Sequence, residues 1–171
     1  MAVETGPRPF AAPPYDVGPG LVLDTMTPAE ATSAGTMCAA MDPWLSYPFP
    51  AGALAAFFAQ SDPGSPRFAL RHNGGLAGAL VVRLNWLHGP YINMLMVAPS
   101  LQGRGLGSAL LAWTEREART NGARNLWIAA TSTNAGAQAL YARHGFAPVA
   151  TFDALIRDGR DEILMRKKLV T

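Results

Sequence analysis

A glycine-rich segment near the middle of the chain, residues 102–108, has the composition of a phosphate-binding loop. It reads Gln-Gly-Arg-Gly-Leu-Gly-Ser and lies between an expected strand and an expected helix. Glycines let several backbone N–H groups point at one site without side chains in the way. The first turn of the helix adds unpaired N–H groups and the positive end of its dipole. The segment therefore favours the pyrophosphate of a nucleotide-containing cofactor; the alternative is a strand-to-helix turn that needs glycine only for its backbone geometry.

The spacing of the glycines argues against two other nucleotide sites. The phosphate loop of nucleotide triphosphatases ends in Gly-Lys-Ser/Thr, and this segment contains no lysine. A dinucleotide loop has the spacing G-x-G-x-x-G and an acidic residue about 20 positions later. Here the glycines are Gly103, Gly105 and Gly107, and residues 130–133 contain no acid. A dinucleotide oxidoreductase is therefore disfavoured, and tight binding of NADH would be needed to restore it.

Two blocks of the sequence resemble a known family. Residues 95–107 read L-x-V-x-P-x-x-Q-x-x-G-x-G, which resembles the acetyl-coenzyme A signature of the GNAT acetyltransferase superfamily. Residues 134–146 read N-x-x-A-x-x-L-Y-x-x-x-G-F, which resembles the second conserved block of that family. The two blocks occur in the family's order, separated by one amphipathic helix and one strand. The resemblance covers roughly residues 67–169, and the start of the chain fits the family only loosely.

The resemblance implies a fold and an activity. The fold would be α/β, with a mixed, mostly antiparallel sheet, two splayed central parallel strands at residues 91–97 and 125–130, and helices on both faces. The activity would be direct transfer of an acetyl group from acetyl-coenzyme A, the cosubstrate, to a primary amine of a small molecule or a protein. A non-catalytic module that binds or senses acyl-coenzyme A is the alternative within the same fold.

The resemblance also implies which residues contact the cofactor. The backbone of residues 95–97 would bind the pantetheine amides, because a strand edge freed by the splay has unpaired donors and acceptors. Arg104 either contacts a phosphate or is a solvated loop residue, and Asn134 either contacts the cofactor or caps a helix. The expected cofactor-binding residues are Leu95, Met96, Val97, Gln102, Gly103, Arg104, Gly105, Leu106, Gly107, Ser108, Asn134 and Tyr141.

Tyr141 is the catalytic residue that the second block implies. Acetyl transfer to an amine passes through a tetrahedral intermediate and expels a thiolate, and a phenol with an ordinary pKa near 10 can protonate that sulfur. The alternative is a core aromatic residue, because Ala137, Leu140 and Tyr141 share one face of the expected helix. A backbone N–H, of Met96 or Val97, would bind the oxyanion.

The general base is left open by the sequence. The attacking amine must be neutral, whereas a free lysine amine has a pKa of about 10.4. Many members of the family have a glutamate on the strand before the glycine loop. Here Asn93 lies at about that position, and residues 87–101 contain no acid. A chain of water molecules or a more distant carboxylate, Asp161 or Glu162, would have to serve.

The acceptor pocket is expected among aromatic and acidic residues outside the two blocks. The candidates are the loop of residues 42–49, Trp86, His88 and the hairpin turn at residues 158–159. Aromatic rings with acids near them suit a cationic amine with an apolar body. The alternative is that these aromatic residues only close the core beneath a proline-rich loop.

The remaining pattern predicts the elements that must position these residues. Apolar periodicity, prolines and glycines divide the chain into strands and helices. Thr27-Pro28-Ala29-Glu30 is a helix start with a capping box. The expected helices are residues 28–41, 51–60, 106–121 and 135–144, and the expected strands are residues 21–24, 67–71, 76–86, 91–97, 125–130, 149–157 and 160–169.

Composition limits the class of protein. The chain has 171 residues, 49% of them hydrophobic and 15% charged, with a formal net charge of +2, as expected for one globular domain that binds no nucleic acid. The basic cluster at residues 166–168 is expected to be a solvated strand end. Cys38, the one cysteine, is expected to be packed, and the three histidines show no metal-ligand spacing.

The sequence also gives expectations for the N-terminal residues, the cellular location and the oligomeric state. The first 20 residues contain five prolines and are expected to form an irregular arm, followed by a single acetyltransferase domain over residues 21–171. No stretch of the sequence has the length of a membrane span. The default expectation is a cytoplasmic protein. The oligomeric state is open, with a homodimer as one option.

Overall fold

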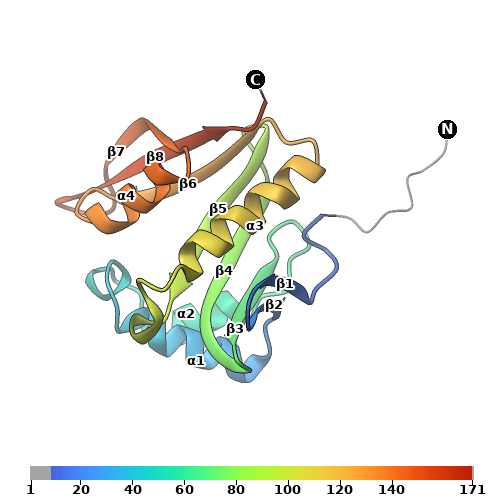
Figure 1. Ribbon diagram of the computed structural model, residues 1–171. Helices are drawn as coiled ribbons and strands as arrows, with labels where there is room; N and C mark the ends of the chain where they lie inside the picture. Colours follow the sequence, from blue (N-terminus) through green and yellow to red (C-terminus); the bar gives the residue numbers. More distant parts are fainter. Residues whose placement is uncertain (1–8, 171) are drawn as a thin grey trace.

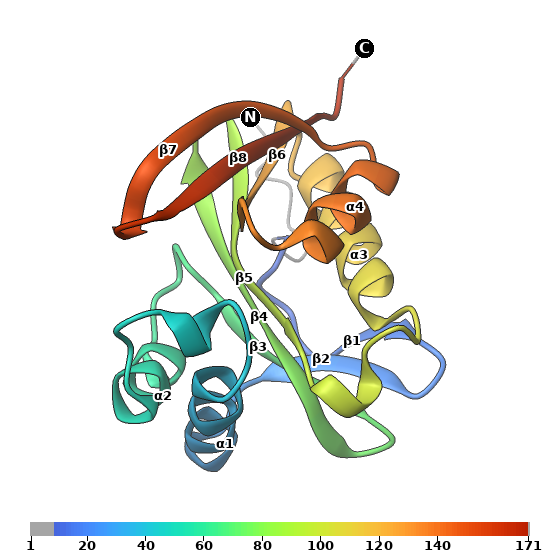
Figure 2. The same ribbon diagram turned by 90° about the vertical axis from the view of Figure 1, so that its left-hand side faces the viewer.

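The computed structural model describes residues 9–170. It contains one eight-stranded sheet with helices against both faces (Figures 1 and 2). In chain order the elements are β1 (Tyr15–Gly18), β2 (Leu21–Thr25), α1 (Pro28–Ala39), the short helix η1 (Trp44–Ser46), α2 (Ala51–Ala59), β3 (Arg67–His72), β4 (Gly75–Trp86), β5 (Gly89–Val97), the short helix η2 (Pro99–Leu101), α3 (Leu106–Thr120), β6 (Asn125–Thr131), α4 (Ala135–Arg143), β7 (Ala147–Arg157) and β8 (Arg160–Lys168).

The strands lie in the order β1-β2-β3-β4-β5-β6-β8-β7. β5 and β6 run parallel, and the other neighbouring pairs within residues 9–170 run antiparallel. A parallel pair needs a crossover connection, which α3 supplies between β5 and β6. The predicted mixed, mostly antiparallel sheet with a central parallel pair is therefore confirmed.

The helices cover the two faces of the sheet in pairs, α1 with α2 and α3 with α4 (Figure 2). Each face has its own hydrophobic cluster. Leu110 and Trp113 of α3 belong to the first cluster, and Cys38, Phe58 and Met96 belong to the second, beneath α1 and α2. Cys38 is fully buried, and burial raises the pKa of its thiol to about 12. It is a packed thiol, as the sequence predicts.

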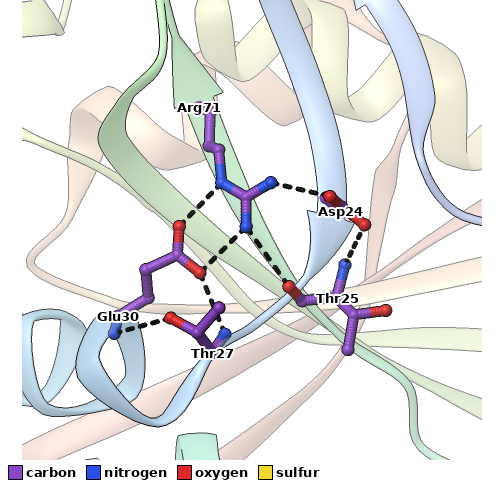
Figure 3. Close-up of polar contacts among 5 residues, drawn as sticks. All are labelled: Asp24, Thr25, Thr27, Glu30 and Arg71. Carbon is purple, nitrogen blue, oxygen red and sulfur yellow. Dashed lines mark hydrogen bonds and ion pairs between the residues drawn. The ribbon is translucent and has the colours of Figure 1, made fainter.

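The start of α1 is fixed by the predicted capping box and by an arginine from the sheet. The Thr27 hydroxyl accepts a hydrogen bond from the backbone N–H of Glu30, and the Glu30 carboxylate accepts one from the N–H of Thr27. Arg71 of β3 then pairs with Glu30 at 2.7 Å and with Asp24 of β2 at 2.7 Å (Figure 3). The hydrogen bonds from Arg71 hold the pKa of Glu30 at about 2. One guanidinium thus joins two strands to the first turn of a helix.

The proline-rich start of the chain contains a strand that the sequence analysis does not predict. β1 pairs with β2, with Tyr15 opposite Leu23, so the prediction of an irregular segment is wrong for residues 15–18. Phe10 is buried, and its ring lies edge-on to Trp113 with 5.5 Å between centroids. The strand has only four residues, which is too short for alternation to stand out among prolines. The first eight residues of the expected arm lie outside the described part of the chain.

Two further observations, on membrane-spanning helices and on metal sites, apply to residues 9–170. Among the helices described, none is both long and apolar enough for a membrane crossing. The described part of the chain also contains no cluster of three or more His, Cys, Asp or Glu side chains arranged to bind a metal ion.

Candidate active site

The two parallel strands at the centre of the sheet separate after a short paired stretch. β5 and β6 pair at Tyr91–Trp127 and Ile92–Ile128. On the other side of β5, the neighbouring residues Val81 and Val82 of β4 lie opposite Met94 and Ile92. Asn93 is therefore the extra residue of a β-bulge, which bends a strand and ends regular pairing. The bulge lies where the gap between β5 and β6 begins.

The bulge decides which backbone groups of β5 face that gap. The N–H of Ala98 donates to the carbonyl of Ala77 on β4 at 2.7 Å, and Met96 lies opposite Ala79 in the same register. Antiparallel pairs alternate in their hydrogen bonding, so the N–H and C=O of Met96 point to β4. Those of Leu95 and Val97 point to the gap, and the Val97 carbonyl there accepts a hydrogen bond from the Gln102 side chain at 3.0 Å.

A cleft of about 660 Å³ occupies the gap and continues along both sides of it. It is lined by the end of β5, the glycine loop, the start of α3, the end of β6, α4, and the loop before and around η1. Ten of the twelve expected cofactor residues line it: Leu95, Val97, Gln102, Gly103, Gly105, Leu106, Gly107, Ser108, Asn134 and Tyr141.

Met96 and Arg104 are the two expected cofactor residues that do not line the cleft. The side chain of Met96 is buried in the cluster beneath α1 and α2, and its backbone N–H and C=O point to β4. Sequence spacing could not show this, because the bulge at Asn93 reverses the alternation of β5. Arg104 is exposed on the loop, in agreement with the solvated alternative.

The glycine loop ends at the N-terminus of α3 with its N–H groups free of a capping side chain. Gly105 is the N-cap residue, in the left-handed conformation with φ 85°, and no side chain caps the helix there. Gly103 has φ 73°, another value that glycine adopts easily. The hydroxyl of Ser108, in the first turn, lies 3.0 Å from Nε2 of His144 at the end of α4. Unpaired N–H groups at this point match the phosphate site that the sequence suggests.

Asn134 and Tyr141 reach the cleft from the two ends of α4. The Asn134 side chain accepts a hydrogen bond from the N–H of Ala137 at 3.1 Å, so it caps the helix while also lining the cleft. Tyr141 is 7% exposed, and burial, with a smaller contribution from nearby Tyr91, raises its pKa. Its hydroxyl has no hydrogen-bond partner among residues 9–170. Burial keeps this phenol protonated and its hydrogen available to a ligand.

Two carboxylates line the cleft, Asp42 and Glu162. Asp42 is exposed at the rim, whereas Glu162 is 6% exposed. Oε1 of Glu162 accepts hydrogen bonds from the Tyr47 hydroxyl and, at 3.0 Å, from the Thr131 hydroxyl. Asp161 does not line the cleft, and its Oδ1 accepts from the N–H of Ala154 at 3.2 Å.

Sequence reasoning missed Thr131, and it named Tyr47 only as part of the loop of residues 42–49, with no link to Glu162. Tyr47 follows η1, and Thr131 ends β6, directly opposite Glu162 of β8. Period-two alternation along the last strand does separate Glu162 from Asp161, because neighbours on a strand face opposite sides. Which side faces the cleft depends on the pairing with β6, and no local signal gives that.

Some of the residues expected around the acceptor line the cleft, and others do not. Tyr47 and Trp44 of the proline-rich loop line the cleft, as does Ile156 from the hairpin of β7 and β8. Trp86 and His88 do not line it. Trp86 instead stacks on Tyr91, with 4.9 Å between ring centroids, and so supports the wall of the cleft from behind.

Comparison with known proteins identifies the family. The sequence model of the acetyltransferase (GNAT) family matches residues 31–146. An acetyltransferase of Agrobacterium fabrum is 30% identical over 139 residues, which cover 78% of this chain and 88% of that protein. A streptothricin acetyltransferase of Streptomyces lavendulae is 38% identical over 80 residues, 46% of this chain. That match spans only 42% of the Streptomyces protein.

A solved structure of a GNAT-family protein from Desulfovibrio desulfuricans shares the fold. Its TM-score is 0.73 at 21% identity, and the superposition covers 88% of this chain and 99% of that one. The fold and the family expected from the two sequence blocks are thereby confirmed. With the family model covering most of the chain and the Agrobacterium relative aligned over 78% of it, this chain belongs to the GNAT family of acetyltransferases.

Proposed function

We propose that this protein transfers the acetyl group of acetyl-coenzyme A directly to a primary amine, with both substrates in the cleft at once. The observation that carries the proposal is the continuity of the site: the open edge of β5, the glycine loop and a buried carboxylate line one cleft. The pantetheine amides would bind the N–H and C=O groups of Leu95 and the C=O group of Val97, which leaves the N–H of Val97 for the acetyl group. The pyrophosphate would bind the N–H groups of the glycine loop and the first turn of α3.

Tyr141 is proposed as the proton donor to the leaving thiolate. The amine nitrogen attacks the thioester carbon, a C–N bond forms, and the carbonyl oxygen becomes an oxyanion that a backbone N–H can bind. Of the two expected donors for that oxyanion, Val97 has its N–H toward the gap and Met96 does not. When the C–S bond breaks, the sulfur takes the proton of the Tyr141 hydroxyl. The position of Tyr141 in the cleft and its unpartnered hydroxyl support this role.

The acceptor is proposed to be a primary amine with an apolar body. The walls at this end of the cleft are the aromatic residues Trp44, Tyr47 and Tyr91, and the buried carboxylate of Glu162 lies beside them. Such walls suit an apolar chain or ring next to a cationic group. Streptothricin is a rational first acceptor because the Streptomyces relative is named for it.

The first test is the shift in thermal unfolding midpoint with acetyl-coenzyme A, with NADH and ATP as controls. A ligand at 100 times its Kd adds roughly 2.7 kcal/mol of stability, which corresponds to about 5–11 °C for a domain of this size. Amine screening with streptothricin, 2-phenylethylamine and an aminoalkylphosphonate follows, by release of free thiol. No shift with acetyl-coenzyme A would contradict the proposed cofactor site. A shift without turnover of any amine would favour a binding module instead.

The domain limits are also a proposal. The strands from β1 onward form one sheet, which supports a single acetyltransferase domain over residues 21–171 with the end of the preceding arm added to its edge. Limited proteolysis tests this: a stable fragment that keeps β1 and β2 with the rest of the sheet is expected. A stable fragment that begins after β2 would contradict it.

A cytoplasmic location and a homodimer are proposals of the same kind. The single cysteine cannot form an internal disulfide, which suits a reducing compartment.

The edge strand β7 supports a dimer, because Val149, Phe152 and Leu155 are 46%, 42% and 61% exposed and a free sheet edge can pair with a second copy. Light scattering would measure the mass in solution, and Phe152→Asp should lower it to that of one chain. A monomer at all concentrations would contradict the dimer.

A further inference from the structure

We propose that Glu162 is the general base of the reaction and that Tyr47 positions it. This inference rests on the proposed acetyl transfer and adds the proton acceptor that the strand before the glycine loop does not supply. On that strand Asn93 lies in the cleft at the bulge, and an amide cannot accept a proton from an amine. Glu162 comes from the other side of the gap, on β8.

The carboxylate of Glu162 is fixed through one oxygen and open through the other. Oε1 lies within hydrogen-bond distance of the hydroxyls of Tyr47 and Thr131. The two hydroxyls also contact each other at 2.5 Å, so their two hydrogens are shared among three contacts. Oε2 has no partner among residues 9–170. Since Glu162 lines the cleft, Oε2 is the oxygen available to a substrate. A carboxylate oriented by two hydroxyls with one free oxygen has the arrangement of a general base.

Burial in the cleft distinguishes Glu162 from Asp42 and Asp161. Its exposed fraction is 6%, and those of Tyr47 and Thr131 are 8% and 2%. Asp42 lies exposed at the rim and accepts a hydrogen bond from Ser46 at 3.1 Å. Asp161 lies outside the cleft. In a buried site a charged hydrogen bond to an amine is stronger than at the rim, because water competes less.

The proton step balances with groups already in the cleft. Attack of the amine on the thioester carbon gives a tetrahedral intermediate with a positively charged nitrogen and an oxyanion. Oε2 of Glu162 takes one proton from that nitrogen, the C–S bond breaks, and Tyr141 protonates the sulfur. The products are the amide and coenzyme A, with Glu162 protonated and Tyr141 ionised. One proton then passes from Glu162 to Tyr141 through solvent, and the enzyme returns to its starting state.

Tyr47 acts through Glu162 and is a positioning residue. Its hydroxyl donates to the carboxylate and fixes its orientation, and its ring is a wall of the cleft. Burial is the largest cause of the raised pKa of Tyr47, followed by the hydrogen bond to Glu162. The phenol therefore stays protonated and keeps donating. The residue also ties the proline-rich loop to β8 across the acceptor end of the cleft.

The test is a double-mutant cycle of Tyr47→Phe and Glu162→Gln, read as kcat for acetyl transfer to 2-phenylethylamine. Glu162→Gln keeps the side-chain volume and an acceptor oxygen, and should lower kcat by roughly 10²-fold or more. Tyr47→Phe should lower kcat about tenfold and leave the KM for acetyl-coenzyme A unchanged. In the Glu162→Gln background the same change should have no further effect, because the two residues act as one unit.

Matched controls separate this mechanism from a loss of folding. Asp161→Asn changes the adjacent carboxylate outside the cleft, and Tyr15→Phe removes a tyrosine hydroxyl on β1; both should keep wild-type kcat. The shift in thermal unfolding midpoint with acetyl-coenzyme A should be the same in every variant. This shift tests the proposed cofactor site independently of the general base. A Glu162→Gln variant with that shift and full turnover would overturn the base while leaving the acetyl transfer standing. Additive effects of the two substitutions would overturn the role of Tyr47.

Discussion

Ile92 of β5 and Ile128 of β6 are the last residues through which the two parallel strands pair. Directly after Ile92 comes the bulge at Asn93, and from there the backbone groups of β5 that point away from β4 have no strand to bond to. The position of this one pair therefore determines where the cofactor-binding edge begins.

Acetyl-coenzyme A should protect the amide hydrogens of Leu95 and Val97 from exchange with solvent. Their N–H groups face the gap, so each new hydrogen bond to acetyl-coenzyme A should slow exchange roughly fivefold, for a net bond of about 1 kcal/mol. Met96 is an internal control, because its N–H already bonds to β4 and should change little. Exchange followed residue by residue by NMR measures this. New protection centred on Met96 would contradict the strand geometry.

Gly105→Ala should weaken the binding of acetyl-coenzyme A. Gly105 has φ 85°, and a Cβ there would contact nothing within 4 Å, so the cost is backbone strain of roughly 1–2 kcal/mol. Relief of that strain would move the N–H groups at the start of α3. Gly122→Ala is the matched control: its φ is 67°, its Cβ is equally free, and it lies beyond the other end of α3. Calorimetric titration should show a higher Kd for the first variant only, at a similar loss of stability in both.

Tyr141→Phe should lower kcat by about 10²–10⁴-fold, the usual contribution of a positioned proton donor. Its free energy of unfolding should stay within about 0.5 kcal/mol of wild type, because the hydroxyl has no partner within residues 9–170 and its loss leaves no unpaired group. Steady-state kinetics and urea unfolding measure the two quantities. Unchanged turnover with an unchanged pH profile would show that another group protonates the thiolate.

The stability of the protein should fall in acid through Glu30. The pKa of Glu30 is lowered from 4.5 to about 2 in the folded state, first by its hydrogen bond to Arg71. A lowered pKa stabilises the fold above the unfolded value, and that contribution is lost as the pH falls from about 4.5 towards 2. Glu30→Gln should therefore lower stability at pH 7 and reduce its dependence on pH in this window. Urea unfolding at pH 7 and pH 3 measures both effects, and Asp158→Asn, in an exposed hairpin turn, should behave as wild type.

Local patterns in the sequence were sufficient to predict the glycine loop and the helix start that form the proposed cofactor site. The glycines of residues 102–108 need no distant partner, since their backbone conformation and the start of α3 make the loop. The capping box at Thr27 and Glu30 is likewise a local device, found as expected. The spacing of the two blocks also indicated the family, because each block lies at a strand-to-helix junction that recurs with the fold.

The acceptor half was decided by tertiary structure. Tyr47 and Glu162 are 115 residues apart, and only the pairing of β8 with β6 and the path of the chain after η1 bring them together. Tertiary structure also decides which of the neighbours Asp161 and Glu162 faces the cleft, because adjacent residues on a strand face opposite sides. It decides as well which face of the sheet the Met96 side chain lies on, because that depends on the bulge. The physical reason is that a sequence states each residue's local preferences, whereas strand register and burial come from the packing of the whole chain. The glycine loop and the helix caps are local; the direction of a side chain at the end of a strand is not.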